Sequence, residues 1–152
     1  MIQLRTAEVQ DSELLWKWAN QPSVRAASYS SENIEWEEHV KWFESKLKDP
    51  NTKIYIVSQK KDLIGYVRFE IKDAEAVVSL AVDEAFRGLG YGVEMVKAGA
   101  CKLFSETDAN VIHAYIKKEN TASFRVFQKA GFRDLGIEKI HDQESYHLIM
   151  RD

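Results

Sequence analysis

The sequence predicts a single α/β domain, residues 1–152, with a mixed and mostly antiparallel seven-stranded sheet and helices on both faces. Three observations predict this class. Apolar runs of strand length alternate with segments of helical periodicity. Successive strands in the middle of the chain are joined by short polar turns, which is typical of antiparallel neighbours. One strand–helix–strand unit, residues 76–116, requires a parallel pair with a right-handed crossover.

The N-terminal part is expected to begin with one strand and one short helix. Residues 2–5 alternate apolar and polar side chains, as a strand does. Asp11 is a suitable N-cap for a helix that ends before Pro22. Residues 20–33 are small and polar, and we expect a loop there, of a length that is typical of functional segments.

A second helix begins near Ser31 or Asn33 and ends near Lys48. The apolar stripe that we expect to pack on the sheet consists of Trp36, Val40, Phe43 and Leu47. His39 lies on the flank of this stripe, and Trp42 lies about 130° away from it. Trp42 therefore needs a second surface, which is either another element or a ligand.

The middle of the chain predicts an antiparallel meander followed by the parallel crossover. Residues 53–57 and 63–71 form a hairpin, and residues 76–82 follow after another turn. A helix begins near Val93, and residues 111–116 complete the crossover. In the strand 63–71, one face carries Val67, Phe69 and Ile71, and the other carries Tyr66, Arg68 and Glu70.

The C-terminal part predicts a short helix and a final hairpin. The helix covers residues 119–131, with Asn120 or Thr121 as its cap, and the strands cover residues 133–140 and 145–150. An edge strand here would allow two subunits to pair, but the residues do not decide between a monomer and a homodimer.

Three glycines lie between the strand 76–82 and the helix that follows it. They belong to the sequence Arg87-Gly88-Leu89-Gly90-Tyr91-Gly92, which fits R-x-x-G-x-G. Glycine lets the backbone turn tightly and approach a ligand, and a helix start offers free N–H groups and a positive dipole end. The turn is therefore predicted to bind phosphate, although it is neither a G-x-G-x-x-G loop nor a P-loop.

A second motif, N-x-x-A/S-x-x-x-Y/F-x-x-x-G-F, is carried by Asn120, Ser123, Phe127, Gly131 and Phe132. With the order of the elements, the two motifs make the whole chain resemble the GNAT (GCN5-related) N-acetyltransferase superfamily. The resemblance implies the GNAT fold, in which the parallel central strands splay apart, and it implies acetyl-CoA (coenzyme A) as the cofactor.

The resemblance also implies a cofactor site built largely from backbone groups. The strand end before the glycine loop would pair with the pantetheine arm, and the amides of residues 88–92 would hold the pyrophosphate. Asn120 would either bind the pantetheine or order its own loop, and Phe127 would pack near the thioester. The predicted cofactor-binding residues are Leu80, Ala81, Val82, Arg87, Gly88, Leu89, Gly90, Tyr91, Gly92, Asn120, Ser123 and Phe127.

Acetyl transfer needs a base that removes a proton from the ammonium, and an acid that protonates the thiolate assists it. Many family members place a tyrosine acid where this chain has Phe127, so Ser123 is the alternative acid, unless it only caps the helix or faces solvent. A thiolate also leaves tolerably without an acid. The candidate bases are Glu70 and His39. Glu70 could instead be a carboxylate paired with Arg68, and His39 could instead be a packed histidine without a catalytic role.

In this fold, the first two helices and their loop select the acceptor. Here they resemble the pattern W-x-N-x-x-x-V-R … E-H-x-x-W-F of the GNAT enzymes that acetylate UDP-linked 4-amino-6-deoxy sugars in the pseudaminic acid pathway. The matching residues are Trp18, Asn20, Val24, Arg25, Glu38, His39, Trp42 and Phe43. Arg25 would pair with the diphosphate, and His39 and Trp42 would stack on a base or sugar unless they only seal the helices against the sheet. Tyr66 and Arg68 complete the predicted acceptor site.

Composition excludes several other functions. With 21 basic and 24 acidic residues, a net charge of −3 and no basic block, neither a nucleic-acid partner nor a membrane anchor is expected. No signal organisation or membrane-length apolar run is present, so we expect a cytoplasmic protein. The lone Cys101 is expected to be a packed thiol. His113, His141 and His147 have no neighbours at metal-ligand spacing, so no metal is expected.

The leading hypothesis is an acetyl-CoA-dependent N-acetyltransferase that acts on the amine of a nucleotide-linked amino sugar by direct attack in a ternary complex. The first alternative is acetylation of a protein N-terminus or another small amine, because related patterns occur in such enzymes. The second is an acyl-CoA-binding sensor domain, because intact cofactor motifs indicate binding only.

Overall fold

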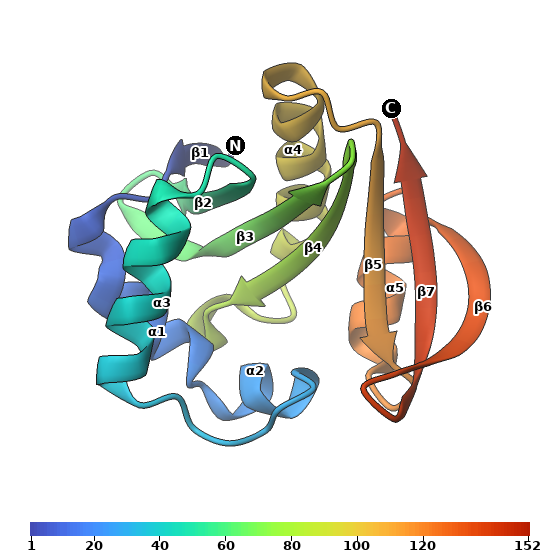
Figure 1. Cartoon of the computed structure of the whole chain (residues 1–152), viewed down its shortest axis with the longest axis horizontal. Helices are drawn as coiled ribbons and strands as arrows, with labels where there is room; N and C mark the ends of the chain where they lie inside the picture. Colours follow the sequence, from blue (N-terminus) through green and yellow to red (C-terminus); the bar gives the residue numbers. More distant parts are fainter.

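A seven-stranded mixed sheet forms the centre of the computed structural model, which describes residues 1–152 (Figure 1). The strands are β1 Gln3–Thr6, β2 Thr52–Gln59, β3 Asp62–Lys72, β4 Glu75–Val82, β5 Val111–Lys117, β6 Arg133–Ile140 and β7 Gln143–Arg151. The helices are α1 Ser12–Ala19, α2 Pro22–Ala27, α3 Trp36–Lys48, α4 Tyr91–Glu106 and α5 Thr121–Lys129, with 3-10 turns at Val9–Asp11 and Glu84–Phe86. None of the helices has the length and apolar character needed to cross a membrane.

The sheet order is β1-β2-β3-β4-β5-β7-β6, and only β4 and β5 are parallel. These two strands pair over Glu75–Val77 and Val111–His113 alone, although β4 continues to Val82 and β5 to Lys117. Beyond that point they diverge (Figure 1). The predicted fold class and the splayed central pair are thus confirmed, and the last part of β4 has no strand partner on its β5 side.

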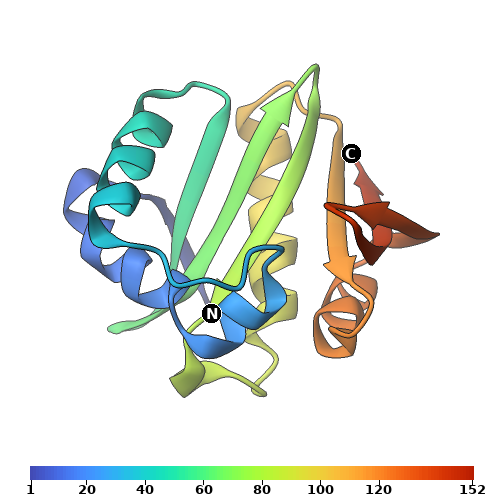
Figure 2. The same ribbon diagram turned by 60° about the horizontal axis from the view of Figure 1, so that its bottom comes forward.

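Two apolar cores hold the sheet between its helices. On one face, Val67 and Phe69 of β3 pack with the buried side of α4, and Phe127 of α5 belongs to the same core. On the other face, Tyr66 packs with Trp18 of α1. The alternation predicted for β3 is therefore confirmed. Helix α2 lies at the open end of the splay (Figure 2), where Lys117 Nζ donates a hydrogen bond of 2.9 Å to the Ala26 carbonyl.

The predicted loop at residues 20–33 contains a helix, α2. Pro22 occupies its first turn, where the missing N–H costs no hydrogen bond and the fixed φ favours the helix. The sequence prediction used Pro22 only as the end of α1 and therefore missed the helix that it begins.

Helix α3 begins at Trp36, later than predicted, because the backbone of Ile34 is held outside the helix. The Asn20 side chain donates to the Ile34 carbonyl (3.0 Å) and accepts from its N–H (2.7 Å), and the Trp16 indole donates to the same carbonyl (2.8 Å). A backbone N–H and C=O bonded in this way are not available to a helix.

The buried face of α3 also differs from the predicted stripe. His39 and Phe43 are its buried residues, whereas the Trp36 side chain is 40% exposed and packs edge-on against Trp16. The helix is rotated toward His39, because Nε2 of that side chain lies 2.8 Å from the Ser12 carbonyl oxygen. The spacing of apolar residues in the sequence does not reveal polar contacts of this kind.

Cys101 is exposed, which corrects the prediction of a packed thiol. The buried side of α4 runs through Val96, Ala100 and Leu103, and Cys101 lies one residue off that line. A step of about 100° per residue turns its side chain away from the sheet.

A chain of hydrogen bonds joins four strands where β4 and β5 remain paired. Nε2 of His113 lies 2.6 Å from a Glu75 carboxylate oxygen, and Nδ1 of His113 lies 2.8 Å from Nε2 of His147. Nδ1 of His147 in turn lies 2.9 Å from Glu138, and Tyr115 stacks on the same imidazole. These histidines hold strands together, and no group of three or more His, Cys, Asp or Glu side chains is placed to hold a metal.

Candidate functional site

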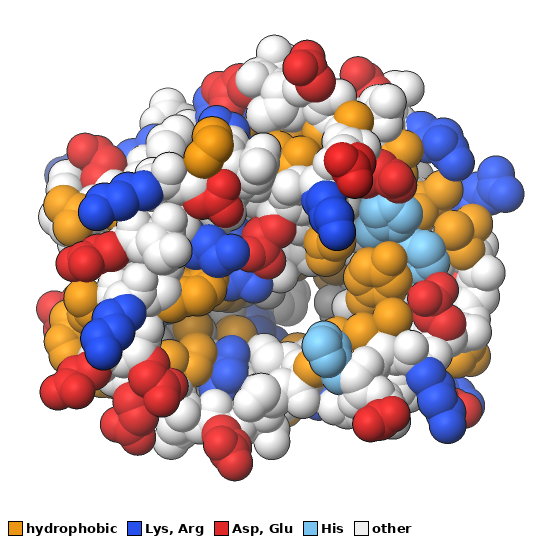
Figure 3. Space-filling model, in the orientation of Figure 1, with side chains coloured by type: hydrophobic (Ala, Val, Ile, Leu, Met, Phe, Trp, Pro, Cys, Tyr) orange, Lys and Arg blue, Asp and Glu red, His pale blue; other side chains and the backbone are white.

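The splay between β4 and β5 opens into a cleft of about 730 Å³. The face of the molecule is visibly hollowed there, between the α1–α3 half and the β5–β7 half (Figure 3). Nine predicted cofactor residues line this larger cleft: Leu80, Val82, Arg87, Gly88, Gly90, Tyr91, Gly92, Asn120 and Ser123. The predicted cofactor residues thus meet in one place, although they come from β4, the glycine loop, α4 and α5.

The glycine loop has the backbone geometry of an anion site. Gly88 and Gly90 have φ of +75° and +85°, and a Cβ at either would meet no atom within 4 Å. The left-handed conformation therefore selects glycine. Gly90 caps α4, which starts two residues before the predicted Val93, and the N–H groups of its first turn have no intrahelical partner. A phosphate group fits such a helix start.

Other features of the larger cleft also fit coenzyme A. The β5 side of β4 has no strand partner beyond Val77, so its N–H and C=O groups are free to pair with an extended pantetheine. Four basic side chains line the same cleft, namely Arg87, Lys117, Arg125 and Lys129. Of these only Arg87 was singled out from the sequence, because the others belong to no motif.

Asp83, the first residue after β4, anchors the loop to α1. Its carboxylate accepts hydrogen bonds from the Trp18 indole (2.9 Å), the Gln21 amide (3.3 Å) and the Ala85 N–H (3.1 Å). Burial acts to raise the pKa of Asp83, but these hydrogen bonds outweigh it and leave the pKa lowered. The Gln21 side chain also accepts from the Glu84 N–H (3.1 Å), so the loop is held from two residues of the α1–α2 region.

Three predicted cofactor residues do not line the larger cleft. Ala81 is 1% exposed, and an added Cβ at Gly65 of β3 would lie 2.0 Å from its carbonyl oxygen, so that oxygen points toward β3. Leu89 is 66% exposed outside the cleft. Phe127 is buried in the core against Phe132 and does not reach the cleft. The motif marks Phe127 as a packing position in this chain.

At the start of α5, the Asn120 side chain accepts a hydrogen bond from the Ser123 N–H (3.2 Å) and so caps the helix. Of the two roles left open for Asn120, the structure shows the ordering of its own loop. The Ser123 backbone makes this contact, and its half-buried hydroxyl has no protein partner on the wall of the cleft.

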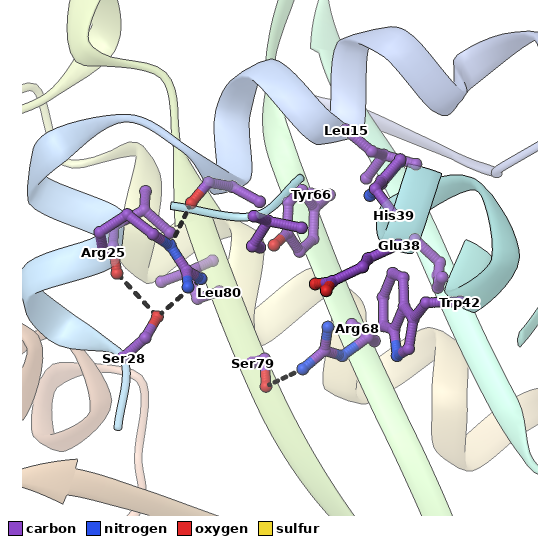
Figure 4. A pocket seen from close by; sticks show the side chains of 14 residues that line it. Leu15, Arg25, Ser28, Glu38, His39, Trp42, Tyr66, Arg68, Ser79 and Leu80 are labelled. Atoms are coloured by element: carbon purple, nitrogen blue, oxygen red, sulfur yellow. Dashed lines mark hydrogen bonds between the residues drawn. The ribbon is translucent and has the colours of Figure 1, made fainter. Parts of the chain in front are cut away.

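A smaller cavity of about 380 Å³ lies between α1–α3 and the sheet (Figure 4). All five predicted acceptor residues line it, namely Arg25, His39, Trp42, Tyr66 and Arg68. Val24 and Leu80 line both this cavity and the larger cleft, so the two spaces meet at these residues. A donor in one space and an acceptor in the other would approach each other there.

Arg25 is held almost entirely by its own region of the chain. Its guanidinium donates to the carbonyls of Ala19 (2.7 Å), Ser30 (3.1 Å) and Glu32 (3.3 Å), and to the Ser28 hydroxyl (3.2 Å). A guanidinium has five N–H donors, and these four hydrogen bonds use four of them, so one remains for a ligand. Burial lowers the pKa of Arg25, but a guanidinium stays charged even without a carboxylate partner.

Arg68 is positioned by the sheet and by Trp42. Its Nη2 donates to the Ser79 hydroxyl (3.1 Å), and its guanidinium lies 5.0 Å from the centre of the Trp42 ring. The nearest carboxylate oxygen, of Glu70, is 4.0 Å from its buried Nε, which has no hydrogen-bond partner. Trp42 thus finds the second surface that its position on α3 requires, in a cation–π contact with Arg68.

Of the predicted catalytic residues, His39 lines the smaller cavity and Ser123 lines the larger cleft. Nε2 of His39 donates to the Ser12 carbonyl, which leaves Nδ1 with its lone pair in the neutral ring. Burial lowers the pKa of His39 and favours this neutral form. Glu70 lines neither space and pairs with Lys46 at 2.6 Å, so the structure does not bring it to the site.

Glu38, in the first turn of α3, lines the smaller cavity and was not predicted as a site residue. Its side chain reaches between Tyr66 and Arg68 in Figure 4. The one signal available in the sequence was its place beside His39 in the acceptor pattern, where it was matched but given no role.

A family model described as an acetyltransferase (GNAT) domain matches residues 2–133. The chain belongs to the GNAT acetyltransferase family. It is therefore an N-acetyltransferase that uses acetyl-CoA as its donor, which confirms the enzyme class and the cofactor predicted from the sequence.

Two relatives, each named Acetyltransferase PseH, come from Campylobacter jejuni subsp. jejuni. The one from strain 81-176 is 24% identical over 145 residues, and the one from strain NCTC 11168 is 26% identical over 144 residues. Each match covers 93% of this chain and 87% of the relative.

Two solved structures show the same fold. The aminoglycoside acetyltransferase AAC(6')-Ib in complex with coenzyme A superposes with a TM-score of 0.86 at 18% identity. The spermidine N-acetyltransferase from Vibrio cholerae, in complex with CoA and spermine, superposes with a TM-score of 0.88 at 16% identity. Each match covers 99% of this chain and 95% of the other.

Proposed function

We propose that the enzyme transfers the acetyl group of acetyl-CoA to the primary amine of a nucleotide-linked amino sugar. The observation that carries this proposal is the charge of the smaller cavity, whose wall holds two guanidiniums, Arg25 and Arg68, and one carboxylate, Glu38. Guanidiniums favour a diphosphate. A polyamine or an aminoglycoside, which carries several positive charges, would meet two like charges in the same small space.

The sequence supports the same acceptor. The chain matches the pattern of the enzymes that acetylate UDP-linked 4-amino-6-deoxy sugars, and its relatives named PseH are acetyltransferases of similar length. Arg25 supplies one free N–H and a positive charge, and Arg68 supplies further donors beside the ring of Trp42. Trp42 is then placed to contact a base or a sugar.

In this proposal the larger cleft holds the cofactor and the smaller cavity holds the acceptor. Acetyl-CoA supplies a thioester acyl group, so that the amine forms a bond to the acyl carbon, the C–S bond breaks, and coenzyme A leaves as its thiol. Among the predicted catalytic residues we retain His39, whose Nδ1 lone pair can take the amine proton through water, and Ser123, whose hydroxyl faces the cleft. Glu70 is set aside, because it lies outside both spaces.

The first alternative, acetylation of a peptide N-terminus, would be favoured by a deep acidic groove. Each of the two spaces has a single carboxylate on its wall, Glu38 in the smaller cavity and Glu119 in the larger cleft. Basic side chains outnumber the acidic ones in both, so neither space is the acidic groove that a peptide with a positive N-terminus would favour.

The test is thiol release from acetyl-CoA with UDP-linked 4-amino-6-deoxy sugars, N-terminal peptides, spermidine and an aminoglycoside as acceptors. We expect release with an amino-sugar nucleotide alone, and Arg68→Gln should raise its KM about tenfold or more. Arg133→Gln, an exposed position on β6, is the matched control and should leave KM unchanged. Release with peptides or polyamines instead would overturn the acceptor class, and binding of acetyl-CoA without release for any of these amines would overturn it too.

A further inference from the structure

Glu38 is the one carboxylate on the wall of the smaller cavity, and it forms no hydrogen bond and no ion pair with any other residue. Its side chain extends into the space between Tyr66 and Arg68 (Figure 4). The Tyr66 hydroxyl also has no hydrogen-bond partner in the protein. Oxygen acceptors without partners therefore converge on the middle of the cavity.

The other charged groups of this cavity are two cations, and each is held by contacts that do not involve Glu38. Arg25 is bonded to three carbonyls and a hydroxyl, and Arg68 is held by Ser79 and Trp42. Although Arg68 is the neighbouring cation, no nitrogen of its guanidinium lies within 4.0 Å of Glu38, the limit of an ion pair. Glu38 thus keeps the full acceptor capacity of both carboxylate oxygens.

A purely structural role does not account for the position of Glu38. An acidic residue in the first turn of α3 stabilises the positive end of the helix dipole, but Glu37 already provides this charge. Glu37 lines neither cavity. Glu37 and Glu38 have the same side chain, lie in the same helix turn and are both exposed, but only Glu38 lines the smaller cavity.

We propose that Glu38 binds the ammonium group of the acceptor and makes the smaller cavity select an amine over a hydroxyl. This inference rests on the proposed function. The anionic end of the acceptor lies with Arg25 and Arg68, and its cationic nitrogen lies with Glu38, where an ionised acceptor forms the stronger kind of hydrogen bond. The role is recognition of the charged nitrogen before transfer, and no covalent step is assigned to Glu38.

The test measures binding of two ligands to the CoA-bound protein by isothermal titration calorimetry. One is a UDP-linked 4-amino-6-deoxy sugar, and the other is the same nucleotide sugar with a hydroxyl in place of the amine. We expect the wild type to prefer the amine, and Glu38→Gln to lose roughly 10- to 100-fold of that preference while binding the hydroxyl sugar as before. Glu37→Gln removes the same charge from the same turn and should keep the full preference.

Two further measurements make the result specific. Thermal unfolding verifies that both variants fold, and the Kd for CoA should be unchanged in both. In steady-state assays the loss in Glu38→Gln should appear in KM for the amine, with kcat nearly constant, because a group that binds the ground state and the transition state equally acts in this way.

The outcomes separate this inference from the function on which it rests. If the wild type binds neither nucleotide sugar, the acceptor class is wrong and the role of Glu38 is wrong with it. If the wild type prefers the amine and Glu38→Gln keeps that preference, the function stands and the role of Glu38 is overturned. An equal loss for both ligands in Glu38→Gln would also overturn it, because the carboxylate would then not recognise the nitrogen.

Discussion

The contact between Trp18 and Asp83 provides a quantitative test of how the glycine loop is held. Trp18 is 2% exposed, and its indole N–H donates to the Asp83 carboxylate at 2.9 Å. Trp18→Phe removes this donor and part of a buried ring. A hydrogen bond to a charged group contributes about 1.5–3 kcal/mol, and the lost ring atoms contribute about 1 kcal/mol.

We therefore expect Trp18→Phe to lower the free energy of unfolding by about 3 kcal/mol, which for a chain of this length is a fall in Tm of roughly 6–12 °C. The Kd for CoA should rise about fivefold, because the loop after β4 would then have to be ordered on binding. Urea unfolding and calorimetric titration with CoA measure the two quantities.

Trp16→Phe is the matched control in the same helix. The Trp16 indole donates to the Ile34 carbonyl, ahead of α3 and away from the glycine loop. Trp16→Phe should cost about 1 kcal/mol and leave the Kd for CoA unchanged. If Trp18→Phe costs less than about 0.5 kcal/mol, or if both variants bind CoA equally well, Asp83 does not anchor the loop in the way described.

Two further predictions concern the sheet and the pH dependence of stability. Gly65→Ala should lower the free energy of unfolding, measured in urea, by more than about 2 kcal/mol, because the new Cβ would lie 2.0 Å from the backbone oxygen of Ala81. Gly99→Ala should cost less, because the nearest neighbours of its new Cβ are side-chain atoms at 3.2 Å or more. Equal costs for the two variants would contradict this. Burial lowers the pKa of His39 in the folded protein, so below about pH 6.5 the unfolded chain binds a proton that the folded chain does not, and stability falls as the pH falls. His39→Gln should therefore lose less stability than the wild type between about pH 7.5 and 5.5, and identical losses would show that His39 is not held neutral.

Most of the architecture could be predicted from the sequence because the strands carry clear local signals. The alternation in β3 and the buried side of α4 follow from side-chain periodicity alone. The glycine loop was recognisable because two positive-φ positions select glycine whatever surrounds them. The parallel pair followed from the crossover rule, and its splay came from the family resemblance.

The elements that the sequence misplaced are those fixed by polar contacts and not by apolar packing. Helix α2 has only six residues, too few to show a helical period, and Arg25 donates hydrogen bonds to the carbonyls around it. The start of α3 depends on the amide of Asn20, and its rotation depends on the contact of His39 with Ser12. No periodicity encodes these polar contacts.

The residues of the candidate site divide in the same way, into those that a sequence motif or pattern marks and those that it does not. The cofactor motifs located the larger cleft, but they also included Phe127, which packs in the core, and omitted basic residues of the cleft that belong to no motif. The five predicted acceptor residues line one cavity, because they lie on one face of β3 and on the helices beside it. Glu38 was missed because a carboxylate in the first turn of a helix has an ordinary structural reason to be there.

The structure of the enzyme bound to CoA and a UDP-linked 4-amino-6-deoxy sugar is the decisive test of the proposed acceptor. We expect CoA to lie along the free edge of β4 in the larger cleft, and the sugar nucleotide to occupy the smaller cavity. The amine should lie within hydrogen-bonding distance of Glu38, close to where Leu80 joins the two spaces. A nucleotide sugar bound elsewhere, with the smaller cavity filled only by water, would show that this cavity is not the acceptor site.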